Sequence, residues 1–488
     1  MKKILLRAGL SPLVNYSPVR VITKNLINNN IGNMLFPASI CRALMREETI
    51  IDTMDTSRKY SSEHIRQINE SYDCMVLPFA NAFRRSFVSQ LDAVTDLVSR
   101  VKIPCIVVGI GLQADLNKEV DTSKLDEAVI RFMKAILKKS NMVGLRGEMT
   151  ADYLKKLGFR AERDFTVIGC PSMYMYGREL PQMEIKELTP DSNVSMNSKI
   201  QLPQKFHDFM FRCTQMIPNF HYVPQVIEEL GQMYMGKGYP KSFVKKIPEH
   251  FPVDFTHPVY QSGRGVSFVN VPSWLKYLRE KDFSFGSRIH GNIASILAGT
   301  PCFIVVSDKR IKELVDYHNI PHILMDDLKE DTSIFDLHEK ADFLAVRRNH
   351  GKRFAHYLDF LKANGLLTIF DDEENVQKDS LYDRRIREVE FAPMVKAFSA
   401  LTPEEQLKRL REVYRGQRKN EQYLKRMSPG VWNSVKDLGR CKILGEPSKS
   451  YEKFFPFIKR DGAALKRKSE ISSGGAIVEC NGTPAKTI

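Results

Sequence analysis

IPCIVVGIG, residues 103–111, is the stretch that decides the fold. It is an apolar run of strand length, typical of a strand that is buried on both faces of a parallel sheet. The segments that follow alternate between helix and strand: a helix with apolar residues at helical spacing from Leu125 to Leu137, a strand over Asn141–Leu145, a helix from about Thr150 to Gly158, and a strand over Phe165–Met173. This β-α-β-α-β series predicts a doubly wound parallel sheet.

A second unit of the same kind follows a polar, proline-containing loop at about Pro181–Asn193. Its predicted elements are a strand over Phe220–Gln225, a strand over Phe283–Ser287, a helix over His290–Ala298, a strand over Pro301–Ser307 and a helix over Ile311–Tyr317. The pattern therefore predicts two α/β domains in tandem, residues 1–185 and 190–345, with a cleft between them.

Apolar strands cease after about residue 345. Helical spacing runs over Gly351–Leu366, and a second helix has Thr402 as its N-cap and Pro403 at its first position. A solvated helix that packs on the body is favoured for this segment over a partner-binding coiled coil. We expect a helical extension over residues 346–430, and a basic, largely disordered tail over residues 431–488.

The chain has 488 residues, too many for one compact core but suited to two domains and a tail. Arg7 interrupts the first apolar run before a signal-peptide core could form. The run from Ile106 to Leu112 contains two glycines and is far shorter than the roughly 20 residues that span a bilayer. A cytoplasmic location is expected, and peripheral association with the inner membrane surface stays open.

The formal net charge of +15 raises the question of nucleic-acid binding. The basic residues are dispersed, and no nucleic-acid-binding signature accompanies them, so specific nucleic-acid binding is not expected. An anionic small substrate, an acidic glycan or a membrane surface explains the charge equally well. The 8 cysteines are scattered without CxxC spacing, which indicates reduced core residues rather than a zinc site or disulfides.

The segment Gly286–Gly291, GSRIHG, offers the first candidate site. Arg288 ends a predicted strand and His290 begins the next helix, so both lie at the carboxyl edge of the sheet, where open α/β sheets bind ligands. The helix N-terminus favours an anion, and Gly291 would allow close approach. A strand-to-helix turn also carries polar residues and glycine for purely local reasons, and this alternative stays open.

Further candidates follow other predicted strands or lie in a turn. Arg146 directly follows the strand Asn141–Leu145, and with Arg288 it could hold a doubly anionic ligand across the cleft. Lys309 and Arg310 follow the strand Pro301–Ser307, although solvated residues of a capped first helical turn explain them equally well. Gly32 and Asn33 lie in a turn before an apolar stretch, which is weak evidence for a phosphate loop.

Several segments resemble the polysaccharide pyruvyl transferase family. The main match is FSFGSRIHGNIASILAGTPCFIVVSDKRIKELVDYHNIP, residues 283–321, which is similar to the hallmark stretch of that family, and a second is VGLRGEMT, residues 143–150. Val223–Gln225 and Asn30–Leu35 are weaker matches. The resemblance implies two Rossmann-like domains in a GT-B-like arrangement. It also implies phosphoenolpyruvate as donor, a sugar as acceptor and no metal or other cofactor.

By position, the resemblance makes His290 the general acid, and makes Arg146 and Arg288 ligands of the donor phosphate and carboxylate. The product would be a pyruvate ketal on a cell-surface polysaccharide or exopolysaccharide, or on its lipid- or nucleotide-linked precursor. This chain has Asn33 where family members commonly have Asp, and Leu77–Asn81 where they have a glycine-rich turn. Two rival functions stay open: a GT-B glycosyltransferase that uses a nucleotide sugar, and a non-catalytic glycan-binding protein.

Overall fold

The computed structural model describes residues 1–56, 59–113, 123–235, 247–254 and 256–417. The chain divides into two compact units, residues 1–401 and residues from 402 onward. In the described part of the second unit, helix α18 (Pro403–Gln417) begins as predicted, because the Thr402 hydroxyl accepts a hydrogen bond from Glu405 N at 3.3 Å. The predicted tail over residues 431–488 lies outside the described residues, as do Cys441 and Cys480.

The first sheet of the larger unit is entirely parallel. Its strands are β1 (Lys2–Arg7), β2 (Thr49–Met54), β3 (Cys74–Pro78) and β4 (Cys105–Val108), in the order β2-β1-β3-β4. A parallel pair, β5 (Val143–Leu145) and β6 (Phe165–Val167), joins this sheet next to β4 through a bridge between Ile110 and Leu145. The strand order reverses between β1 and β3, which creates a topological switch point there.

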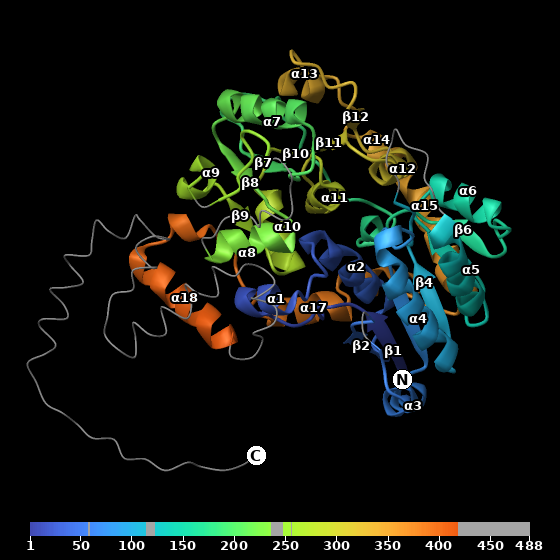
Figure 1. The fold of residues 1–488 in the computed structure, drawn as a ribbon. Coiled ribbons are helices and arrows are strands. Elements are labelled where there is room, and N and C mark those ends of the chain that lie inside the picture. Colours follow the sequence, from blue (N-terminus) through green and yellow to red (C-terminus); the bar gives the residue numbers. More distant parts are fainter. Residues whose placement is uncertain (57–58, 114–122, 236–246, 255, 418–488) are drawn as a thin grey trace, which may run out of the picture. The chain divides into compact units, whose positions relative to one another are not determined.

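Helices cover both faces of this sheet, as Figure 1 shows. One face packs against α3 (Ser62–Ser71), α4 (Val88–Arg100), α5 (Ser123–Leu137) and α6 (Glu148–Lys156) in a single apolar cluster. The remaining elements of this half are α1 (Pro18–Lys24), η1 (Ile31–Met34), α2 (Leu35–Leu44), η2 (Arg85–Phe87) and η3 (Pro171–Tyr174). Every residue of α2 is buried, so this helix is a core element.

The second sheet is also parallel, in the order β12-β11-β10-β7-β8. Its strands are β7 (Val194–Asn197), β8 (Phe220–Tyr222), β10 (Phe283–Gly286), β11 (Cys302–Val306) and β12 (His322–Leu324). One face packs on α7 (Gln204–Met216) and α13 (Ile334–Glu339), at the top of Figure 1. The helices α10 (Val271–Arg279), α11 (Ile289–Ala298) and α12 (Lys309–His318) follow β9, β10 and β11 along the chain. The order reverses between β7 and β10, so both halves repeat the same topology.

The remaining elements complete the unit. They are α8 (Ile227–Met235), α9 (Pro258–Gln261), β9 (Val266–Ser267), α14 (Ala345–Arg348), α15 (His350–Ala363), η5 (Ile369–Asp371), α16 (Glu374–Lys378), α17 (Leu381–Glu388), β13 (Val395–Lys396) and η6 (Phe398–Ala400). Helix α15 returns to the first sheet: a Cβ on Gly144 would lie 2.9 Å from the Phe360 ring, and Asn141 N donates to Asn364 Oδ1 at 3.0 Å. The chain thus crosses from the first half to the second and back again.

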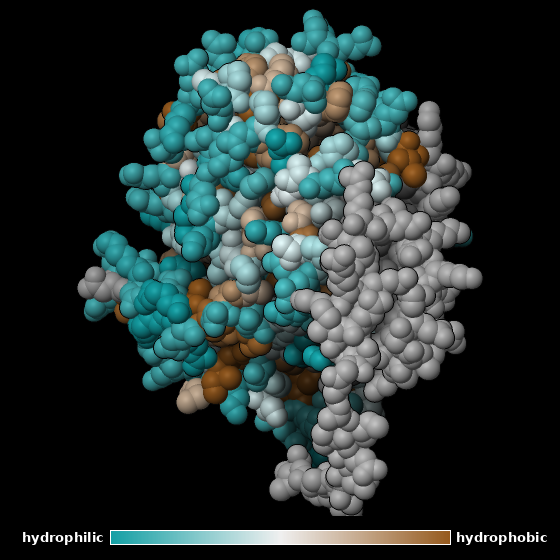
Figure 2. All heavy atoms as spheres, turned by 90° about the vertical axis from the view of Figure 1, so that its left-hand side faces the viewer, coloured by the Kyte–Doolittle hydropathy of each residue, from teal (hydrophilic) through white to brown (hydrophobic). Residues whose placement is uncertain are grey.

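The predicted α/β class with two parallel sheets is confirmed, with some strands shorter than expected. The two sheets lie in one compact unit, residues 1–401, which also includes most of the predicted helical extension. The predicted strand Phe165–Met173 ends at Val167, because Gly169 adopts a φ of 73° and Pro171 begins a 3-10 helix. The six described cysteines are unpaired and buried, as predicted for core residues. Among the described helices, none is both long enough and apolar enough to cross a membrane. The face drawn in Figure 2 carries mostly hydrophilic side chains, with small hydrophobic groups between them.

Candidate functional site

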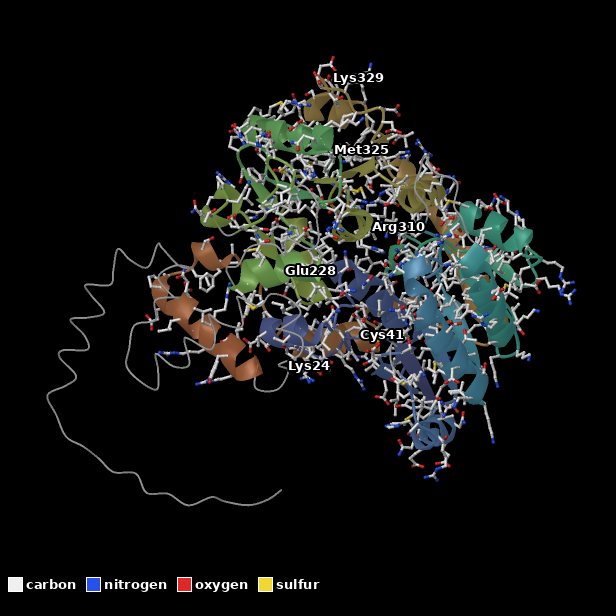
Figure 3. The ribbon with its side chains drawn as sticks, viewed as in Figure 1. Lys24, Cys41, Glu228, Arg310, Met325 and Lys329 are labelled. Atoms are coloured by element: carbon white, nitrogen blue, oxygen red, sulfur yellow. The ribbon has the colours of Figure 1, made fainter. Side chains whose placement is uncertain are left out.

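The candidate site lies where strands of the two sheets end. Arg146 directly follows β5, His290 is the second residue of α11, and Arg310 is the second residue of α12. The structure brings Arg146 and His290 together, with Nη1 of the arginine 3.5 Å from Nε2 of the histidine. Arg310, labelled in Figure 3, lies close enough that its charge lowers the pKa of both. These residues form what we call the central cluster: Arg146, His290 and Arg310.

Arg146 is held by backbone oxygens. Its Nε donates to Gly109 O at 2.7 Å and its Nη2 donates to Phe79 O at 3.2 Å. The side chain is only 1% exposed, and burial lowers the pKa of the guanidinium. Because the carbonyl partners are uncharged, they fix the orientation of this arginine without neutralising it. A buried, oriented cation of this kind is suited to a carboxylate or a phosphate.

His290 is buried between the two halves of the larger unit. Its Nε2 also lies 3.7 Å from Cys170 Sγ, and its ring lies 6.0 Å from that of Phe36. Burial, followed by the charges of Arg146 and Arg310, holds the pKa of His290 well below its usual value. The imidazole is therefore neutral near pH 7 in the free protein. Anions bound to the two arginines would reduce this effect and raise its pKa.

Gly32 and Asn33 reach the site from the turn before α2. A Cβ on Gly32 would lie 2.6 Å from the Cβ of His290, so only glycine permits this packing. Asn33 Nδ2 donates to Ile27 O at 3.1 Å and to Asn28 O at 2.9 Å, which braces the loop after α1. Gly32 thus contacts the predicted catalytic histidine directly, whereas Asn33 supports the neighbouring loop.

Glu313 is a member of the site that the sequence analysis missed. It accepts hydrogen bonds from Thr150 N at 2.8 Å and from the Thr150 hydroxyl at 3.1 Å, which ties α12 to α6. Burial raises the pKa of this carboxyl to about 7. A spacing of three residues from Arg310 puts both on one side of α12, and this was the available sequence signal.

Arg288 lies apart from the central cluster, beside the end of β7. Its Nε donates to Ser198 O at 2.7 Å, its backbone N donates to Asn197 Oδ1 at 2.7 Å, and its Nη2 lies 3.7 Å from Glu229 Oε1. Lys199 lies between the two groups: burial lowers its pKa, the charge of Asp308 opposes this, and the charges of Arg310 and Arg288 lower it further. Asp308 pairs with Lys199 at 3.3 Å and with Arg310 at 3.4 Å. The cations Arg146, Arg310, Lys199 and Arg288 are therefore connected but partly compensated.

Several buried polar atoms near these cations have no hydrogen-bond partner among the described residues. They are Arg310 Nε, Gln225 Nε2, Glu229 Oε1 and the hydroxyls of Ser198, Ser287 and Ser307. Unpaired buried groups cost free energy, so a cluster of them at strand ends indicates positions that water or a ligand fills.

Two predicted residues have other surroundings. A Cβ on Gly291 would overlap Gln225 Nε2, so the close approach that this glycine permits here is that of a protein side chain. Lys309 lines a hollow together with Glu148 and Tyr317, which it shares with Glu313 but not with His290. Nowhere in the described ranges do three or more His, Cys, Asp or Glu side chains form a group that could hold a metal ion.

Two parallel sheets whose strand ends meet at a buried histidine and arginines define a GT-B-like α/β protein with a cationic centre. The sequence model of the polysaccharide pyruvyl transferase family matches residues 30–309, which include Arg146, Arg288 and His290. The chain belongs to that family.

Solved structures resemble the chain only distantly. The UDP-GlcNAc 2-epimerase of Methanocaldococcus jannaschii, in complex with UDP-GlcNAc and UDP, is 11% identical over 74% of this chain and 99% of its own, with a TM-score of 0.39. Anabaena HepE in complex with UDP is 11% identical over 75% and 98%, with a TM-score of 0.37. The UDP-N-acetylglucosamine 2-epimerase of Rickettsia bellii is 8% identical over 74% and 96%, with a TM-score of 0.38. The comparison with curated proteins gave no match.

Proposed function

We propose that this protein transfers pyruvate from phosphoenolpyruvate to two hydroxyls of a sugar, forming a ketal and releasing phosphate. The acceptor would be a cell-surface polysaccharide or exopolysaccharide, or its lipid- or nucleotide-linked precursor. The observation that carries the proposal is the central cluster, in which a buried His290 lies beside Arg146 and within the field of Arg310. Family membership supports the same reaction class.

The donor has two anionic groups, and the central cluster has two arginines for them, one of which, Arg310, also pairs with Asp308 at 3.4 Å. Arg146 and Arg310 would bind the carboxylate and the phosphate, since a guanidinium pairs with either through two parallel hydrogen bonds. Arg288 and Lys199 extend the positive surface on the side of the second sheet. These fixed charges would also stabilise the negative charge that shifts toward phosphate in the transition state.

His290 would move the protons. Once the donor offsets the charges of Arg146 and Arg310, the histidine can hold a proton and give it to the methylene carbon of phosphoenolpyruvate. The oxygen of the first sugar hydroxyl then bonds to the neighbouring carbon, and its proton returns to His290. In the second half of the reaction, the carbon–oxygen bond to phosphate breaks and the second hydroxyl bonds to the same carbon. Its proton leaves with phosphate, so the histidine is regenerated.

The test is a phosphate-release assay with phosphoenolpyruvate across a panel of free, nucleotide-linked and lipid-linked sugars. We expect release that depends on one acceptor. His290→Gln should lower it about 10²-fold or more, the usual contribution of a general acid. The matched control is His64→Gln, an exposed histidine of α3, which should retain activity and melting temperature.

Three results would overturn the proposal. Full activity of folded His290→Gln would remove the histidine from the mechanism. Release of nucleotide from a sugar nucleotide, without phosphate release from phosphoenolpyruvate, would identify a glycosyltransferase. Tight glycan binding without turnover of any donor would identify a glycan-binding protein.

A further inference from the structure

A cavity of about 110 Å³ lies beyond the ends of β1 and β3. Its lining includes residues 7–12 at the end of β1 and residues 79–82 directly after β3. Residues 269–271 of the second half also line it. A single water needs only about 10–15 Å³ on this measure, so a larger molecule has room. The position is the switch point of the first sheet, where open α/β sheets form ligand crevices.

The lining combines flat apolar rings with amides. Its rings belong to Tyr16, Phe36, Phe79, Phe87 and Phe391, and its amides to Asn28, Asn33, Asn81 and Asn270. Apolar walls with a few convergent polar groups are typical of small-molecule sites. The amides of Asn33, Asn81 and Asn270 also donate hydrogen bonds within the protein, which fixes their orientation. Their remaining donor or acceptor atoms suit sugar hydroxyls, and an aromatic ring can cover the apolar face of a pyranose. This chemistry suits a sugar ring.

Two arginines give the cavity its charge. Arg7 lies 4.2 Å from the Phe79 ring and Arg84 lies 4.8 Å from the Phe87 ring, and no Asp or Glu is among the described lining residues. Burial lowers the pKa of Arg7 to about 10, partly opposed by nearby Asp55, and burial and the charge of Arg310 lower the pKa of Arg84. Since the cations are incompletely compensated, an anion in the cavity would be stabilised.

The cavity shares two residues with the central cluster. Phe36 lines it, while the same ring lies 6.0 Å from that of His290 and 5.7 Å from Cζ of Arg146. Phe79 also lines it, and its carbonyl oxygen accepts the hydrogen bond from Arg146 Nη2. A molecule in the cavity would therefore lie next to the donor centre, on the side of the first sheet.

We propose that this cavity is the acceptor subsite and that it takes a sugar ring bearing an anionic group, either a carboxylate or a phosphate ester. The ring lies against the phenyl side chains and the anion pairs with Arg84 and Arg7. The role of the bound sugar as acceptor rests on the proposed function. Binding of an anionic sugar can be measured without any turnover. The carboxylate would come from a uronic acid, and the phosphate from the link between the sugar and its carrier.

The experiment measures binding to the full chain with phosphoenolpyruvate at saturation, so that the donor centre is occupied. The probes are glucose 1-phosphate, glucuronic acid, glucose and inorganic phosphate. We expect at least one anionic sugar to bind tenfold or more tightly than glucose and than inorganic phosphate. Tighter binding of glucose 1-phosphate would identify a phosphate ester as the anionic group, and tighter binding of glucuronic acid would identify a carboxylate.

Variants test the position. Arg84→Gln should weaken anionic-sugar binding tenfold or more, and Arg84→Lys, which keeps the charge, should weaken it less. The matched control is Arg85→Gln, because Arg85 is the exposed neighbour and is not among the lining residues. Equal binding of glucose and both anionic sugars, equal binding of inorganic phosphate, or unchanged binding by Arg84→Gln would overturn the proposal. If phosphoenolpyruvate fails to bind but the anionic sugar still depends on Arg84, the proposed function fails and the sugar site stands.

Discussion

Substitution of Gly32 by alanine tests whether catalysis depends on the placement of His290. The new Cβ would lie 2.6 Å from the Cβ of His290 and 3.0 Å from Asn30 Oδ1. Carbon atoms pack at about 3.5–4.0 Å, so one of the two segments must move by about 1 Å. The three atoms nearest to the added methyl group belong to His290 and Asn30, and we therefore expect Arg146 and Arg310 to keep their positions.

The magnitude follows from this displacement. A shift of about 1 Å at a reacting group can cost about 10²-fold in rate, whereas overpacking costs about 1–3 kcal/mol of stability. Gly32→Ala should therefore lower kcat for phosphate release by about 10²-fold, with KM for phosphoenolpyruvate changed by less than about threefold on the same argument. It should remain folded at room temperature.

The assay is steady-state phosphate release, combined with thermal unfolding of the same samples. The matched control is Gly351→Ala in α15, where the nearest atom to an added Cβ, Arg178 Cγ, is 3.6 Å away. Alanine in a helix is favoured over glycine by about 1 kcal/mol, so this control should be neutral or slightly stabilising. Wild-type kcat in Gly32→Ala would refute the reasoning, and so would equal losses in both variants.

Three further predictions follow from the charges. Burial raises the pKa of Glu313, so the stability that this residue contributes is greatest below about pH 4 and declines as pH rises toward about 7. Urea unfolding should show this decline in the wild type and its loss in Glu313→Gln. Parallel pH profiles of the two proteins would contradict the prediction. Phosphoenolpyruvate binding near pH 7 should take up a proton, because the donor offsets the charges that lower the pKa of His290. Calorimetry in buffers of different ionisation enthalpy should find this uptake in the wild type. Equal uptake in His290→Gln would exclude His290 as the group that takes up the proton. Arg42 pairs with Asp383 at 2.7 Å and is largely buried, so Arg42→Met should lower the free energy of unfolding by about 3 kcal/mol; a loss below about 1 kcal/mol in urea titrations would show that this pair contributes little.

The segment from β10 to β11 could be predicted from the sequence because its signals are local, whereas β7 and β12 of the same sheet were not predicted. The strand Phe283–Gly286, the helix Ile289–Ala298 and the strand Cys302–Val306 lie within one or two residues of the ranges expected from apolar runs and turn residues. Asp308 caps α12 by accepting a hydrogen bond from Ile311 N at 3.0 Å, so Lys309 and Arg310 do lie in a capped first helical turn.

The first 100 residues were harder to interpret. Helix α2 is buried on all sides and therefore lacks the polar stripe by which a surface helix is recognised. Strand β2 lies at the edge of the sheet and is only partly buried, so its composition, TIIDTM, does not form an apolar run. The three strands β1, β2 and β3 were not predicted, although they provide the switch point at which the further site is proposed.

The candidate site could be predicted in part. Arg146, His290 and Arg310 each follow a strand, and that position is visible in a sequence. Arg288 and His290 are two residues apart at a helix start, where side chains at i and i+2 point in different directions, so they join different groups of residues. The contacts of His290 with Cys170 and Gly32 join segments more than 100 residues apart, and local patterns carry no information about them.

The return of α15 to the first sheet has a consequence for synthesis of the chain on the ribosome. The backbone N of Asn141, just before β5, donates to the side chain of Asn364, so this hydrogen bond cannot form until more than 200 further residues have been made. At a synthesis rate of about 5–20 residues per second, formation of this hydrogen bond is delayed by roughly 10–40 s. Because the chain leaves the first half and returns to it, a single cut in the chain cannot separate the two halves into independent domains. A fragment that ends before residue 350 should expose the apolar surface around Gly144 that Phe360 covers in the complete protein.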